Sequence, residues 1–206
     1  MPGKSTIKHK VCRAVGANLN GTPSAALTLS RRPNRPGQHG GGRQAKISPF
    51  GQQLKETQKL KAFYGISSKK LRRYYDNAAK VRKQTNVALV QSLETRLDNV
   101  VYRLGFAPTI RASRQLVTHG HICVNGRCVD ISSFNCQIGD IISINTRTQS
   151  QKLVEGFIKS NDRPIPPFLA LQPDGKSGRV LQNCSLKDIG LQARPQLSIE
   201  HYSRRA

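Results

Sequence analysis

The first 55 residues of this sequence contain no aspartate or glutamate, and Glu56 is the first acid in the chain. Across 206 residues there are 34 Lys and Arg but only 11 Asp and Glu, a formal net charge of +23. Residues 1–93 hold 19 of the cations and 2 of the acids. The repulsion between so many like charges destabilises a compact protein unless a polyanion neutralises them. The scarcity of acids therefore predicts a nucleic-acid-binding protein, and the alternative is a basic surface that is only solvated.

Long apolar runs are also missing. No stretch approaches the length of a membrane span, about 18 apolar residues, and none near the start resembles the apolar segment of a secretory signal. We therefore expect no membrane association, although the acid-free start also resembles an organelle transit peptide. The five cysteines are odd in number and include no Cys-x-x-Cys pair, which favours free thiols in a reducing compartment.

Signatures of catalysis are equally scarce. The stretch "PDGKSGR" at 173–179 contains Gly-Lys-Ser, but a phosphate-binding loop needs glycine five residues before Gly175, where this chain has Ala170. We interpret it as a polar turn. Asp98 has no second carboxylate on its helical face, and its neighbours Arg96 and Arg103 indicate ion pairing. Nothing predicts an enzyme, a cofactor or a small-molecule substrate.

A cluster of His119, His121, Cys123 and Cys128 raises the question of zinc. Zinc sites usually combine two close pairs of ligands separated by a loop, and this spacing does not fit that pattern. A metal is possible in principle, but small buried cysteines at strand positions are commoner. We expect no metal here.

Residues 1–50 show little apolar periodicity and are rich in Gly, Pro, Ser and Asn, which predicts an extended segment ordered mainly by a partner. Its most basic part is "RRPNRPGQHGGGRQAK", residues 31–46, with six basic residues (counting His39) and no acid. By composition alone this stretch would be a linker. In an acid-free context it instead predicts contact with a polyanion.

Regular structure is expected from about Gln52, where apolar residues adopt helical spacing up to a break at Gly65. Ser67 or Ser68 can cap a second helix. One face of this helix is apolar, with Leu71, Tyr74, Tyr75 and Ala78 at helical spacing. Basic residues flank that face, namely Lys69, Lys70, Arg72 and Arg73.

Residues 94–145 predict a compact mixed module. One long helix over "NVALVQSLETRLDNVVYRLGF" ends at Gly105, and a shorter helix capped by Thr109 ends at Gly120. Asn125-Gly126, between two alternating apolar runs, is typical of a type I′ hairpin. "IGDIISIN" predicts a further strand. In the tail, "RPIPPFLAL" excludes regular helix, and "QLSIEHYS" predicts a last strand.

The module also carries features that suit RNA. Arg111 and Arg114 share a helix face, and RNA is held by guanidinium–phosphate contacts and by stacking on aromatic rings. Tyr74, Tyr75 and Tyr102 are candidates for stacking, with a core position as the alternative for the first two. No DNA-recognition helix is evident.

The segment "RLDNVVYRLGFAPTIRASRQLVTHGHICVNGRCVDI", residues 96–131, resembles the RNA-binding module of the uS4 family of small-subunit ribosomal proteins. "RPGQHG" at 35–40, "FGQQLKETQKLKAFYG" at 50–65 and "EHYSR" at 200–204 are similar to the same family, in its bacterial and organellar form. The resemblance extends in order over about residues 30–206.

This resemblance implies an α+β fold: a helical first domain, interrupted by an RNA-binding module of two helices packed on a small, mostly antiparallel sheet, and an extended basic N-terminal segment. The expected parts are 1–46 (extended segment), 47–93 (helical domain), 94–155 (module) and 156–206 (C-terminal segment completing both domains).

The resemblance further implies a function and its partners. The family binds small-subunit rRNA at a junction of helices in the 5′ domain, nucleates assembly of the body, and contacts protein uS5 at an interface that affects decoding accuracy. Basic residues after the Pro-Gly-Gln-His-Gly motif line the path by which mRNA enters; by position these are Arg43 and Lys46, although the chain is about one residue longer there. The expected location is the cytoplasmic ribosome, with an organellar ribosome as the alternative.

Charge and resemblance together give the candidate rRNA-binding residues: Arg31, Arg32, Arg35, Gln38, His39, Lys69, Lys70, Arg72, Arg73, Arg96, Arg103, Arg111, Arg114 and His119. Many family members carry an N-terminal four-cysteine zinc knuckle, but only Cys12 lies in that region here, so we expect the zinc-free form.

Two other functions are compatible with the sequence. The same module occurs as an accessory in RNA-modifying and tRNA-charging enzymes, but the residues on either side of it show no catalytic signature. A small free RNA chaperone is the second alternative.

Overall fold

The structure is a computed structural model, and it describes residues 9–19, 22–42, 46–81, 84–159, 163–188, 190 and 193–204. The chain divides into two compact units, one formed by Met1–Asp76 with Gly190–Ala206 and the other by Asn77–Ile189. Helices and a small antiparallel sheet occur together, which confirms the predicted α+β class. Within the described residues, no helix is both long enough and apolar enough to cross a membrane.

The first unit is helical. Its elements are α1 (His9–Val15), α2 (Pro23–Arg31), the 3-10 helix η1 (Gln38–Gly41), α3 (Pro49–Phe63), most of α4 (Ser68–Ala79) and α9 (Pro195–Ser203). The two helices expected after Gln52 are confirmed as α3 and α4, and Ser67 Oγ accepts the Lys70 N–H as the predicted cap. The predicted apolar face of α4 is buried at Leu71, Tyr75 and Ala78.

The prediction that residues 1–50 are extended is wrong for α1 and α2. Helix α1 buries Cys12 and Val15 and packs against α2 and α3. These helices are too short to show an apolar period in the sequence, and their stability comes from tertiary packing. Thr22-Pro23 was a usable signal, because proline is favoured in the first turn of a helix.

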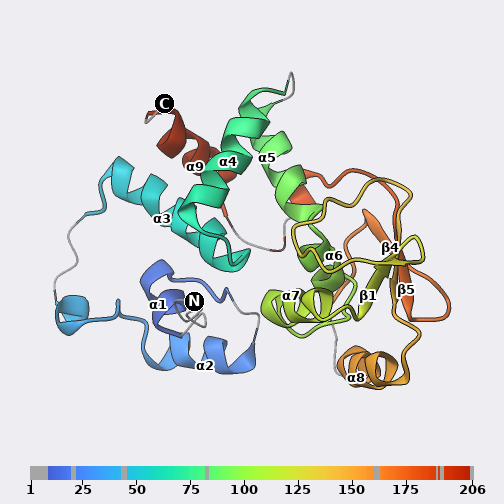
Figure 1. Ribbon diagram of the computed structural model, residues 1–206. Coiled ribbons are helices and arrows are strands. Elements are labelled where there is room, and N and C mark those ends of the chain that lie inside the picture. The colour runs from blue at the N-terminus through green and yellow to red at the C-terminus, as the bar shows by residue number, and fades with distance from the viewer. Residues whose placement is uncertain are drawn as a thin grey trace. The chain divides into compact units, whose positions relative to one another are not determined.

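The predicted C-terminal strand is also wrong, since residues 195–203 form α9, which packs on α3. Figure 1 shows α9 (red) beside α3 (cyan). Glu56 of α3 accepts the backbone N–H of Arg194 at 3.0 Å, Gln53 donates to Glu200 at 2.9 Å, and Tyr75 contacts Tyr202 with ring centroids 5.4 Å apart. The end of the chain thus completes the unit in which it begins.

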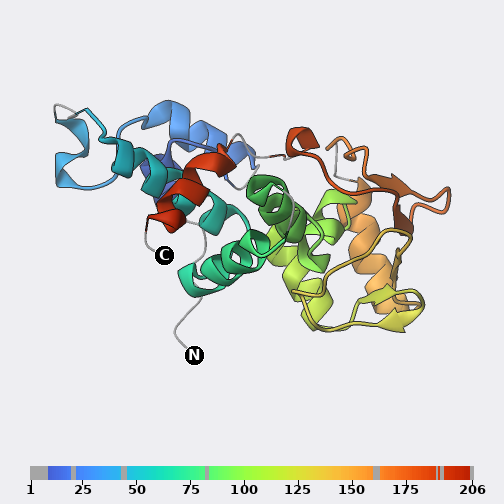
Figure 2. The ribbon, with the colours of Figure 1, turned by 90° about the horizontal axis from the view of Figure 1, so that it is seen from above.

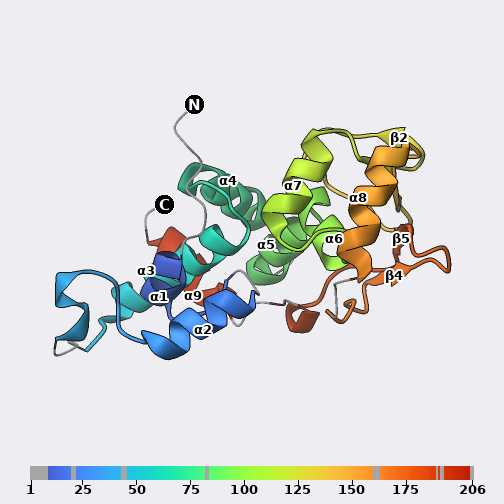
Figure 3. The ribbon, with the colours of Figure 1, turned by 90° about the horizontal axis from the view of Figure 1, so that it is seen from below.

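The second unit combines helices with the sheet. Helices α5 (Thr85–Glu94), α6 (Leu97–Arg103) and α7 (Ile110–Thr118) precede the strands, α8 (Thr148–Lys159) packs against β3, and η2 (Leu186–Asp188) follows them. Figures 2 and 3 show α8 (orange) close to the strands, with α5, α6 and α7 (green) in the same unit. The predicted segment 94–155 lies wholly within this unit.

The predicted long helix is interrupted at Arg96, which has extended backbone angles and caps α6. Leu97 N donates to Phe134 O and Cys136 N donates to Thr95 O, both at 2.8 Å, so this point of the chain pairs with a distant loop instead of continuing the helix. The predicted apolar face is nevertheless buried on both helices, from Val90 to Leu104.

The sheet has five strands in the order β2-β1-β3-β5-β4, all antiparallel. The strands are β1 (Ile122–Val124), β2 (Arg127–Cys128), β3 (Ile141–Ile144), β4 (Leu169–Leu171) and β5 (Ser177–Val180). The predicted hairpin is confirmed, with positive φ at Asn125 and Gly126. Residues 173–176 form a polar turn, in which Asp174 accepts from the Lys176 and Ser177 N–H groups. The prediction of a turn over 173–179 is wrong for residues 177–179, which belong to β5 and pair with β3 and β4.

One apolar core joins the helices to the sheet. It contains side chains from α5, α6, α7, α8 and the strands, among them Val101, Phe106, Val117, Ile142 and Phe168. Helix α7 begins where predicted, because Thr109 Oγ1 accepts the Ala112 N–H at 3.2 Å. The core holds α7 and the hairpin in fixed positions, and α7 carries the candidate residues Arg111 and Arg114.

Candidate nucleic-acid interface

The basic segment 31–42 is a folded turn whose side chains face solvent. Arg31, Arg32, Arg35, Gln38 and His39 are all exposed. Gly37 has a φ of 108°, which L side chains rarely adopt. A Cβ at Gly40 would lie 2.8 Å from the carbonyl carbon of Arg35, so this position has no room for a side chain. The glycines of the motif therefore shape a turn that presents the cations, and residues 31–42 are called the basic turn below.

Arg13 binds the backbone of this segment, to which it is joined within the first unit. The residue types around Arg13 did not predict this role. Arg13 Nε donates to the carbonyl oxygens of Arg32 and Asn34 at 3.1 Å each, and its Nη2 donates to Arg35 O at 3.4 Å. The contacts are to backbone, so a pattern of side-chain types could not reveal them. Arg13 thus orders the chain between α2 and η1 and leaves the other arginine side chains outside.

A recess of about 300 Å³ lies next to this segment in the first unit. Arg35, Lys55 and Gln58 are among the side chains that line it, together with Pro36 and Ile47. Two cations and an amide facing one recess suit a phosphate group, because they supply several charge-assisted donors.

The start of α4 gathers a second group of cations. Lys69, Lys70 and Arg73 are exposed, and in the described part of the chain they form no ion pair. Arg72 lies 3.9 Å from Asp76 in an exposed pair, which contributes little to stability. Tyr75 is a core residue, as the alternative interpretation held, and Tyr74 is half-buried. The surface of α4 therefore offers lysine and arginine rather than a stacking ring.

Arg96 and Arg103, which were predicted to contact rRNA, instead bind carboxylates of the second unit. Arg96 is 3% exposed and binds Asp98 with two bonds of 3.0 and 2.7 Å. Arg103 binds Glu94, a residue of 0% exposure, with bonds of 3.1 and 2.8 Å. The predicted pairing of Asp98 with Arg96 is confirmed, whereas Arg103 pairs with Glu94 instead. This placement argues against direct contact of Arg96 with RNA.

Arg111 and Arg114 both project from α7 and are half-buried. Arg114 binds the same Asp98 carboxylate as Arg96, with its Nη2 2.6 Å from Oδ2. Burial lowers the pKa of Arg111 from its ordinary value, and the neighbouring charge of Arg114 adds to this effect. Because Asp98 already compensates the charge of Arg114, Arg114 is the weaker candidate of the two.

His119 is exposed at the end of α7, and its ring stacks with that of His121 at a centroid distance of 6.2 Å. His121 Nδ1 lies 2.8 Å from Ser150 Oγ at the start of α8. His119 thus presents a flat ring directly after the helix that carries Arg111. Tyr102, by contrast, is buried beneath the guanidinium of Arg163, 4.1 Å from its ring centroid.

Of the two residues predicted to meet mRNA, Lys46 is exposed and Arg43 lies outside the described residues. Two further cations on the sheet escaped the sequence analysis. Arg127 follows the hairpin turn, and Arg179 lies on β5, and both are exposed. No periodic signal marks β5, whose four residues include a glycine.

The thiols are reduced. The described residues contain no group of three or more His, Cys, Asp or Glu side chains placed to hold a metal ion. Cys123 is buried as expected, but the same expectation is wrong for Cys128, which is exposed near the turn on the two-residue strand β2.

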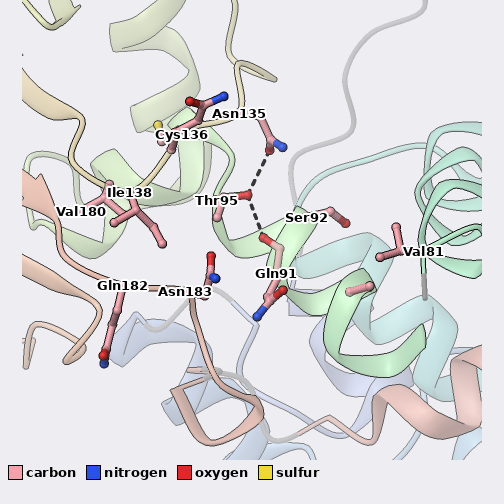
Figure 4. A pocket seen from close by; sticks show the side chains of 12 residues that line it. Val81, Gln91, Ser92, Thr95, Asn135, Cys136, Ile138, Val180, Gln182 and Asn183 are labelled. Carbon is pink, nitrogen blue, oxygen red and sulfur yellow. Dashed lines mark hydrogen bonds between the residues drawn. The ribbon is translucent and has the colours of Figure 1, made fainter. Parts of the chain in front are cut away.

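A pocket of about 510 Å³ in the second unit has a different character (Figure 4). Its lining is made of amide, hydroxyl and apolar side chains, including Gln91, Asn135, Ile138 and Asn183. Thr95 Oγ1 donates to Gln91 O at 2.8 Å and lies 3.0 Å from Asn135 Oδ1. The pocket has no charged side chain in its described lining, so it does not belong to the cationic surface.

Comparison with known proteins agrees with this geometry. Two family models match adjoining parts of the chain, the ribosomal protein S4/S9 N-terminal domain over residues 5–94 and the S4 domain over residues 95–142. Proteins described as small ribosomal subunit protein uS4 from Rhodospirillum rubrum, Bartonella quintana and Paramagnetospirillum magneticum are 41%, 39% and 43% identical to it. The alignments cover 96%, 99% and 96% of this chain and 97%, 100% and 97% of those proteins.

These relatives are ribosomal structural proteins and not enzymes, which confirms the prediction that the chain has no catalytic role. The matches together span both units, from the basic N-terminal part to the sheet. This chain belongs to the uS4 family of small ribosomal subunit proteins.

Proposed function

We propose that this protein binds the rRNA of the small ribosomal subunit directly and remains there as a structural constituent. The observation that carries the proposal is a set of exposed cations that form no ion pair in the described part of the chain. They are Arg31, Arg32, Arg35, Lys69, Lys70 and Arg73. Their charge needs a polyanion to neutralise it, and the family supplies the identity of that polyanion.

Neutralising these cations with phosphates releases counterions from the RNA, which is the main source of such affinity. Gln38 and His39 add side-chain donors beside the arginines of the turn. Arg111 offers a guanidinium on α7, and His119 offers a flat ring directly after that helix. RNA is bound through contacts of these kinds. Arg72 and Arg114 each have a carboxylate partner, so we assign them a smaller share of the affinity. Arg96 and Arg103 form ion pairs inside the module, so we assign them a structural role and no contact with rRNA.

We further propose that the bound rRNA is a junction of helices in the 5′ domain and that binding nucleates assembly of the body. Contact with protein uS5 would give the protein its influence on decoding accuracy. Lys46, with Arg43, would lie along the path by which mRNA enters. These proposals extend the family resemblance. We also propose the cytoplasmic ribosome as the location, with an organellar ribosome as the alternative.

Hydroxyl-radical footprinting tests the proposal most directly. Addition of the protein to a 5′-domain transcript should protect a compact set of nucleotides around one junction. The variant Lys69→Ala/Lys70→Ala should lose part of that protection, whereas Lys152→Ala, which removes an exposed cation of α8, should keep it. Protection spread evenly along the transcript would contradict the proposal, because it would indicate non-specific attraction.

A free RNA chaperone with the same module is the remaining alternative. Sedimentation of ribosomes through high salt separates the two functions. A structural constituent stays with the small subunit, whereas a chaperone is washed off.

A further inference from the structure

Cys123 and Cys128 face each other across the hairpin formed by β1 and β2. They are directly opposite in the register, and their sulfur atoms lie 3.0 Å apart. The adjacent pair, Ile122 and Val129, is joined by a backbone hydrogen bond of 3.2 Å, so Cys123 and Cys128 occupy a non-hydrogen-bonded position. Side chains approach most closely at such positions, with Cα atoms about 4.5 Å apart, within the range that a disulfide spans.

The two thiols differ in their surroundings. Cys128 is exposed, and Asn145 donates its amide N–H to the Cys128 sulfur at 3.2 Å. The same amide donates to Gly120 O at 2.9 Å, which fixes its orientation. Cys123 is 7% exposed, and burial together with its contact to Cys128 raises its pKa to about 11. Cys128 is therefore the thiol that a reagent can reach, and Cys123 is a protonated thiol held beside it.

We propose that Cys123 and Cys128 form a dithiol site that reacts with small disulfides, such as oxidised glutathione, and closes a disulfide across the hairpin. Among the other cysteines, Cys12, Cys136 and Cys184 are buried, with exposures of 0%, 4% and 1%. Neither cysteine is among the side chains proposed to contact phosphate. The dithiol site therefore does not depend on the proposed function.

The reaction is an ordinary thiol–disulfide exchange. The Cys128 thiolate attacks one sulfur of oxidised glutathione, forms a mixed disulfide and releases one glutathione thiolate. Cys123 then loses its proton, attacks the Cys128 sulfur and displaces the second glutathione thiolate. Two electrons pass from the protein to the glutathione disulfide, and the two thiol protons end on the two glutathione molecules.

The sequence provides a direct assay. Trypsin cleaves after Arg114, Arg127 and Arg147, which places Cys123 in peptide 115–127 and Cys128 in peptide 128–147. The full-length protein is incubated with oxidised glutathione, its remaining thiols are alkylated, and the digest is analysed by mass spectrometry without reduction. We expect the two peptides to be joined, with Cys136 of the second peptide alkylated. Full alkylation of both Cys123 and Cys128, or a bridge through Cys136, would overturn the proposal.

Two variants test the order of the steps. Cys123→Ser should accumulate a glutathione adduct on Cys128, because the second thiol is missing. Cys128→Ser should show neither the bridge nor an adduct on Cys123. A wild-type protein that stops at the adduct on Cys128 would show that the hairpin cannot close, and this result would also overturn the proposal. None of these measurements depends on RNA binding. Failure of the dithiol proposal and failure of the proposed function can therefore be recognised separately.

Discussion

At the scale of single residues, Asp98 determines how much of the module's charge is available. Its carboxylate binds the guanidinium groups of Arg96 and Arg114, and it is 1% exposed. Ser113 Oγ also donates to its backbone carbonyl. Removing one partner of a buried ion pair leaves the other charge without compensation, which costs far more than the pair contributes.

We expect Asp98→Ala to lower the free energy of unfolding by about 3–5 kcal/mol, since it leaves Arg96 buried and uncompensated. Urea denaturation followed by circular dichroism measures the loss. Asp76→Ala is the matched control, because its pair with Arg72 is exposed and should change stability by less than about 1 kcal/mol. Equal effects of the two substitutions would show that Asp98 does not support the module.

Cys136 contributes to an alkaline limit of the second unit, as does Cys184, because burial also raises the pKa of the Cys184 thiol to about 12. Burial, followed by the nearby charges of Asp140 and Asp98, raises the pKa of the Cys136 thiol from 9.0 to about 12. A group with a raised folded-state pKa keeps its proton in the folded protein after the unfolded chain has lost it. The contribution of this thiol to stability is therefore constant below about pH 9 and decreases above it, by about 1.4 kcal/mol per pH unit up to the folded pKa.

Urea denaturation between pH 8 and pH 10.5 measures this decrease, and Cys136→Ala should show a shallower dependence than the wild type. The two proteins are compared by slope, because the substitution also lowers stability at pH 8 by removing buried contacts. Identical slopes would contradict the assignment of the alkaline limit to this thiol.

At the scale of elements, α4 and α7 carry their cations in different ways. Lys69 and Lys70 project from the first turn of α4 into solvent, whereas Arg114 of α7 is tied to Asp98. Substitutions in the two helices should therefore separate binding from stability.

We expect Lys69→Ala/Lys70→Ala to weaken rRNA binding by about 1–3 kcal/mol, through lost phosphate contacts, while the free energy of unfolding changes by less than about 0.5 kcal/mol. Arg111→Ala should also weaken binding by about 1–3 kcal/mol. Arg114→Ala should chiefly lower stability. Filter binding and urea denaturation on the same samples measure both quantities, and the assignment fails if Arg114→Ala alters only binding.

Several helices and the hairpin could be predicted from the sequence, and others could not. Helices α3, α4 and α7 and the hairpin were foreseeable, because their signals are local: apolar spacing, serine or threonine caps, and Asn-Gly. The break at Arg96 was not, because it depends on backbone pairing with residues 134–136. Helix α9 was mistaken for a strand, since Leu197 and Ile199 suggest alternation. The residues that it buries are Ser198, His201 and Tyr202, at helical spacing.

The candidate interface was foreseeable to a similar extent. Residue type and charge identified the cations of the turn and of α4. They could not distinguish exposed arginines from those that carboxylates neutralise, because Glu94 meets Arg103 only after the chain turns between α5 and α6. Nor could they identify Arg13, whose partners are backbone oxygens.

At the scale of the whole molecule, the net charge of +23 controls how the protein finds and holds RNA. Nine of the 11 acids lie in residues 94–206, where Glu94 and Asp98 neutralise three arginines. Residues 1–93 contain only 2 acids, so most of their cations remain to be matched by phosphates. Affinity should consequently decrease steeply with salt, with a logarithmic slope of about 0.7–0.9 per phosphate contacted.

We expect the slope to differ between variants that lose an exposed cation and variants that lose a paired one. Arg31→Ala/Arg32→Ala should reduce the slope by about 1.4–1.8, since two phosphate contacts are lost. Arg103→Ala should leave the slope unchanged, because its charge is already compensated by Glu94, and its effect should appear in stability instead. Binding to 5′-domain RNA is measured from 50 to 400 mM potassium chloride, with each variant first checked for folding. A slope that is the same for the wild type and the Arg31→Ala/Arg32→Ala variant would remove the basic turn from the interface, and the exposed lysines of α4 would then have to account for the affinity.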